Sequence, residues 1–120
     1  MPIAMHHEDG NLFRIALRGT LRKADFDRCQ QTLVAEMARL GPVRLLFVLE
    51  EFGGWARGDN WRDMSFYVTY GSSIQRIAIV GPEEWRAQSL MFAGADLRTA
   101  PVEFFPAHAA ADARTWVQAP

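Results

Sequence analysis

Apolar residues recur along this chain with two periods, one of two residues and one of three to four, and segments of the two kinds alternate. From Leu12 to Arg18 every second side chain is apolar, which predicts a half-buried strand. Ile3 to His7 is a weaker strand candidate, and Asp9-Gly10 between the two segments is a turn signal. The chain is therefore expected to begin with a β-hairpin, which Gly19 ends.

The clearest helix is predicted from Lys23 to Leu40. Asp25 lies near its start, where a negative charge suits the helix dipole, and Gly41-Pro42 stops it. Its apolar residues recur at spacings of three and four and form a single stripe: Phe26, Cys29, Leu33, Met37 and Leu40.

The segment from Val43 to Leu49 is apolar on both faces, and such a strand is usually central in a parallel sheet. Gly53-Gly54 cannot continue a strand comfortably, so a loop is expected there. Asp59 is a good N-cap for a helix from Asn60 to about Tyr70. Because apolar groups lie on most sides of that helix, we expect it to be buried on more than one face or to border a pocket or a partner.

Three further elements follow in the second half of the chain. Residues 74–80 form a strand of the buried type, and Pro82 opens a helix in which Trp85 and Phe92 share the inner side. A short strand at residues 102–104 precedes a last helix at residues 108–117. After the hairpin, strands and helices alternate, which predicts an α/β fold with right-handed crossovers, a mostly parallel sheet and covering helices.

Composition narrows the class of protein. A length of 120 residues indicates a single domain over 1–120, and 13 basic against 14 acidic residues leave no electrostatic footprint for nucleic acid. The longest apolar run is too short for a membrane helix, and the first residues do not resemble a signal peptide. Cys29 is the single cysteine, so a reduced, cytoplasmic setting is expected.

Several short segments together resemble the SpoIIAA-like family, the small bacterial proteins grouped with STAS and SEC14 domains. The more specific ones are Phe52-Gly53-Gly54-Trp55 and Trp61-Arg62-Asp63. The others are Asp25-Phe26, Leu45 to Leu49, Arg76 to Gly81 with Trp85, Val102 to Phe105, and Ala113 to Trp116. The resemblance covers nearly the whole chain.

The resemblance implies a STAS-like sheet with helices and an N-terminal hairpin. Distant STAS relatives bind a kinase partner and are switched by phosphorylation of a serine in the loop after the third strand. This sequence departs from that pattern, because residues 50–60 contain neither serine nor threonine. SEC14-like relatives suggest instead a lipid or another hydrophobic ligand.

The candidate site lies where the strand at residues 43–49 ends. Ligands of open α/β sheets bind beyond the carboxyl ends of strands, so Phe52, Gly53, Gly54 and Trp55 form either a recognition loop or a turn in which Trp55 covers the core. Trp61 and Tyr70, with other aromatic residues, either line an apolar pocket or belong to the core. Asp63 either joins a polar site with neighbouring charges or serves as a helix cap.

No catalytic or metal-binding constellation is evident from the spacing of residues. His6 and His7 point to opposite faces of a strand, and Cys29 lies on an apolar helix stripe, where a thiol is usually inert. We therefore expect a non-enzymatic regulatory or protein-interaction module of STAS type without a cofactor. The alternative is a small-molecule or lipid-binding domain with an apolar pocket beside residues 52–61. A homodimer is compatible with the aromatic content.

Overall fold

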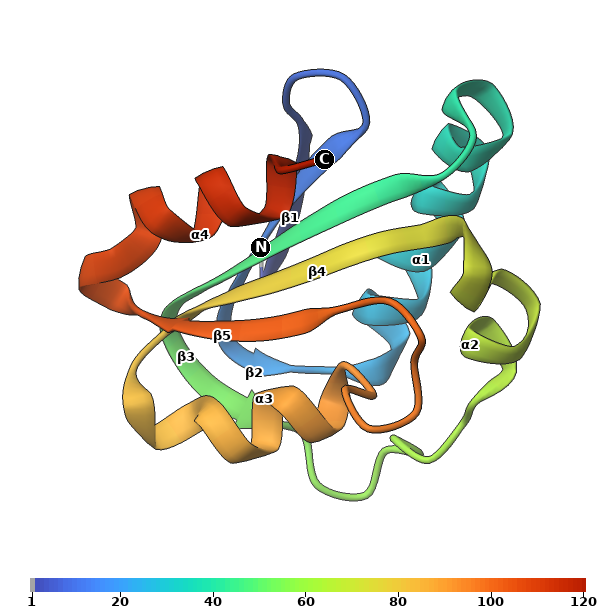
Figure 1. The fold of residues 1–120 in the computed structure, drawn as a ribbon. Helices are drawn as coiled ribbons and strands as arrows, with labels where there is room; N and C mark the ends of the chain where they lie inside the picture. The colour runs from blue at the N-terminus through green and yellow to red at the C-terminus, as the bar shows by residue number, and fades with distance from the viewer. Residues whose placement is uncertain (1) are drawn as a thin grey trace.

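A computed structural model of the chain describes residues 2–120 and shows a five-stranded sheet with four α-helices (Figure 1). The strands lie in the order β1-β2-β3-β4-β5. β1 and β2 are antiparallel, and every later neighbour is parallel. The predicted α/β class, the N-terminal hairpin and the mostly parallel sheet are thereby confirmed. The strand bounds are Ile3–His7 (β1), Leu12–Leu21 (β2), Val43–Trp55 (β3), Ile74–Gly81 (β4) and Val102–Pro106 (β5).

The helices divide unequally between the two faces of the sheet. Because each parallel strand lies beside the strand that precedes it, right-handed crossovers place all the connecting helices on one face. Phe26, Phe66 and Phe92 from these helices pack on the larger core, while Ala113 and Val117 of the last helix belong to a smaller core on the other face. The helix bounds are Lys23–Leu40 (α1), Ser65–Tyr70 (α2), Arg86–Phe92 (α3) and Ala110–Gln118 (α4).

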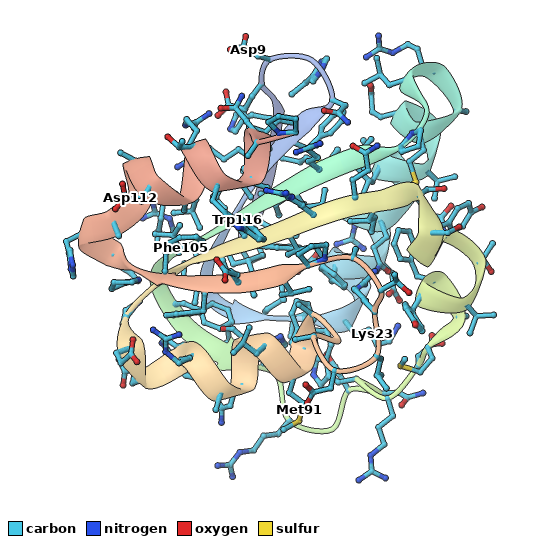
Figure 2. The ribbon with its side chains drawn as sticks, viewed as in Figure 1. Asp9, Lys23, Met91, Phe105, Asp112 and Trp116 are labelled. Carbon is cyan, nitrogen blue, oxygen red and sulfur yellow. The ribbon has the colours of Figure 1, made fainter. Side chains whose placement is uncertain are left out.

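The last helix covers its face of the sheet through aromatic and small side chains. Trp116 of α4 lies beside Phe105 of β5, with ring centroids 5.8 Å apart (Figure 2). Ala113 and Val117, both fully buried, allow α4 to approach the strands closely. Arg76 of β4 stacks its guanidinium over Trp116 at 5.0 Å and donates a hydrogen bond to the Trp116 carbonyl.

The predicted loop at Gly53-Gly54 is wrong, because β3 continues through both glycines to Trp55. β3 pairs with β2 over this part, with register shifts on both sides of Gly19, and Glu51 has a positive φ of 49°. A Cβ at Gly53 would lie 3.2 Å from the Gly19 carbonyl carbon. The glycines therefore serve a bulged and closely paired strand end, rather than ending the strand.

The predicted helix from Asn60 to Tyr70 is also wrong in its first half, because α2 begins only at Ser65. The side chains of Asn60 and Asp63 accept hydrogen bonds from the backbone N–H groups of Arg62 and Ser65, two residues further on in each case. Such local bonds give the backbone an alternative to helix. A crossover helix of six residues, none of them buried, is the result.

The remaining boundaries differ less from the predictions. The helix predicted to open at Pro82 begins as a 3-10 turn at Glu83–Trp85 and becomes α-helical at Arg86. β2 does not end at Gly19 but continues to Leu21. The helix predicted from Lys23 to Leu40 has these bounds in the structure.

Candidate functional site

A cavity of about 460 Å³ lies between the sheet and the three crossover helices. Ile15, Leu45 and Ile77 form its floor on the sheet, and α1 contributes Phe26 and Leu33 among others. Segments around α2 and α3 provide the remaining wall. The volume falls in the range of small-molecule sites, roughly 300–1,000 Å³.

The cavity follows from the shortness of α2. Three crossovers share this face, and the middle one offers six helical residues where its neighbour α1 has 18. The chain before α2 is irregular from Ala56 to Met64, with turns at Arg57-Gly58 and Trp61-Arg62, so it does not fill the space as a continuous helix would. A hollow between α1 and α3 is the consequence of this uneven cover.

Phe92 of α3 is the centre of an aromatic cluster on the cavity wall. Its ring centroid lies 4.9 Å from Phe26 of α1, 5.2 Å from Trp55 of β3 and 5.9 Å from Trp61. Tilted and edge-on rings at such distances attract one another beyond the burial of their surface. The cluster joins three crossovers and gives the cavity a rigid apolar side.

The two tryptophans of the cluster differ in their hydrogen bonding. Trp61 Nε1 donates to the Ala56 carbonyl at 2.9 Å, which holds the indole against the strand end. Trp55 Nε1 is buried without an acceptor. Both residues are half-buried and line the cavity.

Lys23, at the first position of α1, links two segments beside the cavity. Its Nζ lies 2.8 Å from Asp27 Oδ1 on α1 and 3.2 Å from Asp63 Oδ2 before α2. The hydrogen bonds that the Lys23 ammonium donates to Asp27 and to Asp63 raise the pKa of Lys23, against the effect of its partial burial. Hydrogen bonds from Ser65 and then from Lys23 lower the pKa of Asp63 to about 2. The two carboxylates are therefore paired with one and the same ammonium group.

Arg98, in the turn region between α3 and β5, is a cavity residue that the sequence did not indicate. Its Nε donates to the Ala93 carbonyl at 2.6 Å, whereas its Nη1 is buried without a partner. The guanidinium lies 5.1 Å from the centroid of the Tyr67 ring. Burial lowers the pKa of Arg98, and among residues 2–120 no Asp or Glu opposes this effect. Its segment has no hydrophobic period, so no local pattern distinguishes it from a surface arginine.

The residues proposed as a site from the sequence separate into two groups. Trp55, Trp61 and Asp63 line the cavity. Phe52 is 8 % exposed and packs edge-on against Trp55, with centroids 4.9 Å apart, and it does not line the cavity. Gly53 and Gly54 belong to the paired end of β3 and are likewise outside the lining.

Tyr70 lies beside a second and more polar hollow. This hollow, of about 340 Å³, lies between α1 and α2 and shares Lys23, Asp27 and Asp63 with the cavity. Tyr70 packs on Phe66, with ring centroids 5.3 Å apart. The two hollows meet at the Lys23 ion pairs.

Exposed apolar side chains gather around the cavity. Over residues 2–120 the large hydrophobic side chains with high exposure are Met64, Val68, Met91 and Leu97, and all except Val68 line the cavity. Met91 is 80 % exposed and projects from α3 (Figure 2). The cavity thus has an apolar rim as well as an apolar wall.

The site offers few groups for nucleophilic or metal chemistry. Cys29 lines the cavity from α1, and burial raises the pKa of its thiol to about 11. No group of three or more His, Cys, Asp or Glu side chains suited to a metal ion occurs within residues 2–120. Within that same range, no helix is long and apolar enough to cross a membrane.

The fold and the cavity define a small α/β domain with a STAS-like sheet, and comparison with known proteins gives its family. The model of the SpoIIAA-like family matches residues 12–118, so the chain belongs to the SpoIIAA-like family. No curated protein matches the sequence.

Solved structures agree with this assignment. An uncharacterised protein of the DUF3478 family from Shewanella loihica PV-4, described as having a SpoIIAA-like fold, superimposes with a TM-score of 0.72. The two chains share 19 % sequence identity, and the match covers 96 % of this chain and 91 % of the other. At that identity the likeness concerns the fold alone.

Proposed function

We propose that this SpoIIAA-like protein is a non-enzymatic regulatory module that acts by binding, and that it holds a small hydrophobic molecule in the cavity beneath α2. The cavity is the observation that carries the proposal. Its size, its aromatic wall and its few polar groups are typical of small-molecule sites. Family membership is compatible with a binding role and leaves the ligand open.

The chemistry of the cavity supports binding rather than catalysis. Both carboxylates that line it are paired with Lys23, which leaves neither free to act as a general base. The thiol of Cys29 has a pKa of about 11, so it is a poor nucleophile near neutral pH. Among the described residues no histidine lines the cavity.

Native mass spectrometry of gently purified protein tests this proposal. We expect an added mass that organic extraction removes. Cys29 gives a matched pair of variants because it lines the cavity from a stable helix. Cys29→Phe fills the space and should abolish the added mass, whereas Cys29→Ala should retain it. Unaltered thermal unfolding would show that both variants are folded.

Two results would contradict the proposed binding of a small hydrophobic molecule. A protein that carries no added mass, and that takes up no hydrophobic dye displaceable by fatty acids or alcohols, has no functional cavity. Equal binding by Cys29→Phe and Cys29→Ala would place the ligand elsewhere on the molecule.

A protein partner is the second candidate, and exposed apolar side chains on α2 and α3 are the observation that favours it. Val68 on α2 is 78 % exposed and Met91 on α3 is 80 % exposed, on two neighbouring crossovers. Exposed apolar patches often mark interaction surfaces. A second copy of this chain is one such partner, which would make a homodimer.

Affinity capture and molecular-mass measurement distinguish these partners. Light scattering of the purified protein reports the homodimer, and capture from the native cell reports a different chain. Val68→Asp with Met91→Asp should remove either interaction, since both side chains are exposed and the changes leave the core intact. Capture of the same protein by this double variant would show that Val68 and Met91 do not form the interface.

A further inference from the structure

Arg98 lines the cavity with a positive charge that has no carboxylate partner. We propose that Arg98 binds the carboxylate of an apolar organic acid whose hydrocarbon part occupies the cavity. This inference rests on the proposed binding function and adds the chemical class of the ligand.

The balance of charge around the cavity supports an anion. Its lining contains three cationic side chains, Lys23, Arg62 and Arg98, and two anionic ones, Asp27 and Asp63. Lys23 takes both carboxylates in ion pairs. No lining carboxylate is then left for the two arginines, and the lining as a whole keeps a net charge of +1, from three cationic against two anionic side chains. Arg62 is exposed to water, whereas Arg98 is half-buried. A charge without a partner therefore costs more free energy at Arg98 than at Arg62.

The buried polar atoms of the lining residues that lack a partner also favour a ligand with a hydrogen-bond acceptor. Of the buried side-chain atoms without a hydrogen-bond partner, two belong to lining residues, and both are donors: Arg98 Nη1 and Trp55 Nε1. Buried polar groups normally have partners, and a donor left alone raises the free energy of the folded protein. A carboxylate brought to Arg98 by a ligand supplies an acceptor for its guanidinium.

The guanidinium of Arg98 is held in a fixed plane. Its Nε is bound to the Ala93 carbonyl and one face lies over Tyr67, whose hydroxyl donates to the Leu97 carbonyl. A planar fork held in this way matches the two oxygens of a carboxylate. Because it provides one positive charge, it balances a monocarboxylate, whereas a phosphate monoester would bring a second charge into an apolar site.

The rest of the cavity fits the hydrocarbon part of such an acid. Phe26, Trp61 and Phe92 form a continuous aromatic wall, and the floor on the sheet is aliphatic. Burying the chain of an acid there gains the hydrophobic part of the binding free energy, while Arg98 fixes which end of the molecule carries the charge.

Titration with three ten-carbon probes near neutral pH tests the inference: decanoic acid, 1-decanol and decyl phosphate. Tryptophan fluorescence reports binding, because Trp55 and Trp61 line the cavity. We expect decanoate to bind roughly ten- to a hundredfold more tightly than decanol, as a charge-assisted hydrogen bond predicts. Decyl phosphate should bind more weakly than decanoate.

Variants then locate the preference. Arg98→Met should remove the difference in affinity between decanoate and decanol. Arg57→Met removes the same charge from an exposed arginine outside the cavity, and it should retain the difference. Arg98→Lys keeps the charge without the fork and should retain only part of the preference.

Each outcome decides between the two proposals. Equal affinity of the unaltered protein for decanoate and decanol overturns the role of Arg98 and leaves the cavity as a binding site. Tighter binding of decyl phosphate overturns the assignment to a carboxylate. A preference for decanoate over decanol that survives in Arg98→Met overturns the role of Arg98. If no probe binds at all, the proposed function itself fails. The comparison of probes on the unaltered protein stands even where Arg98→Met does not fold.

Discussion

The carboxylate of Asp59 accepts a hydrogen bond from the backbone N–H of Lys23 at 2.9 Å, across 36 residues of sequence. It also receives both the Nε and an Nη of Arg22, each at 3.2 Å. Arg22 itself gives α1 no side-chain cap. Asp59 therefore caps α1 from the segment that follows β3, instead of starting a helix of its own.

Replacement of Asp59 tests this cap. Asp59→Ala leaves an N–H group at the start of α1 without its partner and should lower the melting temperature. Asp59→Asn is the matched control, because an amide oxygen still accepts from Lys23 while the ion pair with Arg22 is lost. We expect Asn to retain most of the stability. If Ala and Asn are equally harmful, the ion pair rather than the cap is what matters.

Gly54 is expected to be intolerant of a side chain. Its φ is +96°, and a Cβ would lie 3.1 Å from Cη2 of Trp85. Gly58 has a similar φ of +87° and open space around it, so Gly58→Ala isolates the backbone strain. Gly58→Ala should cost about 1 kcal/mol in urea unfolding, and Gly54→Ala clearly more. Equal losses would mean that Trp85 moves aside without cost.

Phe92 should be the most important side chain for stability within the aromatic cluster on the cavity wall. It contacts rings from α1, from β3 and from the segment before α2. Because it is half-buried, Phe92→Ala should cost about 2–3 kcal/mol, below the roughly 3–5 found for fully buried sites. The neighbouring Met91→Ala, at an 80 % exposed position, should stay within about 0.5 kcal/mol. Chemical denaturation of both variants decides the ranking.

The lowered pKa of the Asp63 carboxylate makes the stability of the protein depend on pH in the acidic range. Its pKa is lowered from 3.8 to about 2, so its contribution is complete above pH 3.8 and is lost as the pH falls toward 2. The melting temperature of Asp63→Asn should therefore lie below that of the unaltered protein at pH 6, and the difference should shrink between about pH 4 and pH 2. A difference that does not change with pH would contradict this account.

Cys29 reports on the cavity through its reactivity. With a thiol pKa of about 11, its reaction with a thiol reagent at pH 8 should be at least about a hundredfold slower than that of a free cysteine. Because Cys29 lines the cavity, a bound molecule should slow the reaction further. Rates measured with and without decanol give a direct readout. An unchanged rate at saturating decanol would place that molecule outside the cavity.

The parts of the fold that sequence predicts well are those with a local cause. The helix from Lys23 to Leu40 follows from its apolar stripe and from Gly41-Pro42, and both signals lie within the element. The hairpin and the buried strands follow from local patterns in the same way. The mostly parallel sheet then follows from the alternation of strands and helices after the hairpin.

The errors arise where partners are distant in sequence. Gly53 and Gly54 indicate a loop until their neighbours are known, and those neighbours are Gly19 and Trp85. Asp59 has the residue type of an N-cap, but its partner is the start of another helix. The sequence around Arg98 contains no hydrophobic period that would indicate a buried position for this residue. Its importance depends on a cavity that exists because α2 is short.

The neighbour-to-neighbour order of the strands has a consequence for biosynthesis. Each strand from β2 to β5 pairs with the strand made just before it, so the sheet can grow by one strand at a time as the chain leaves the ribosome. At every stage the strand made last forms a free edge of the sheet, to which the next strand can pair. No strand has to be inserted between two others. The cap on α1 is the exception, because Lys23 must wait until Asp59 has been synthesised.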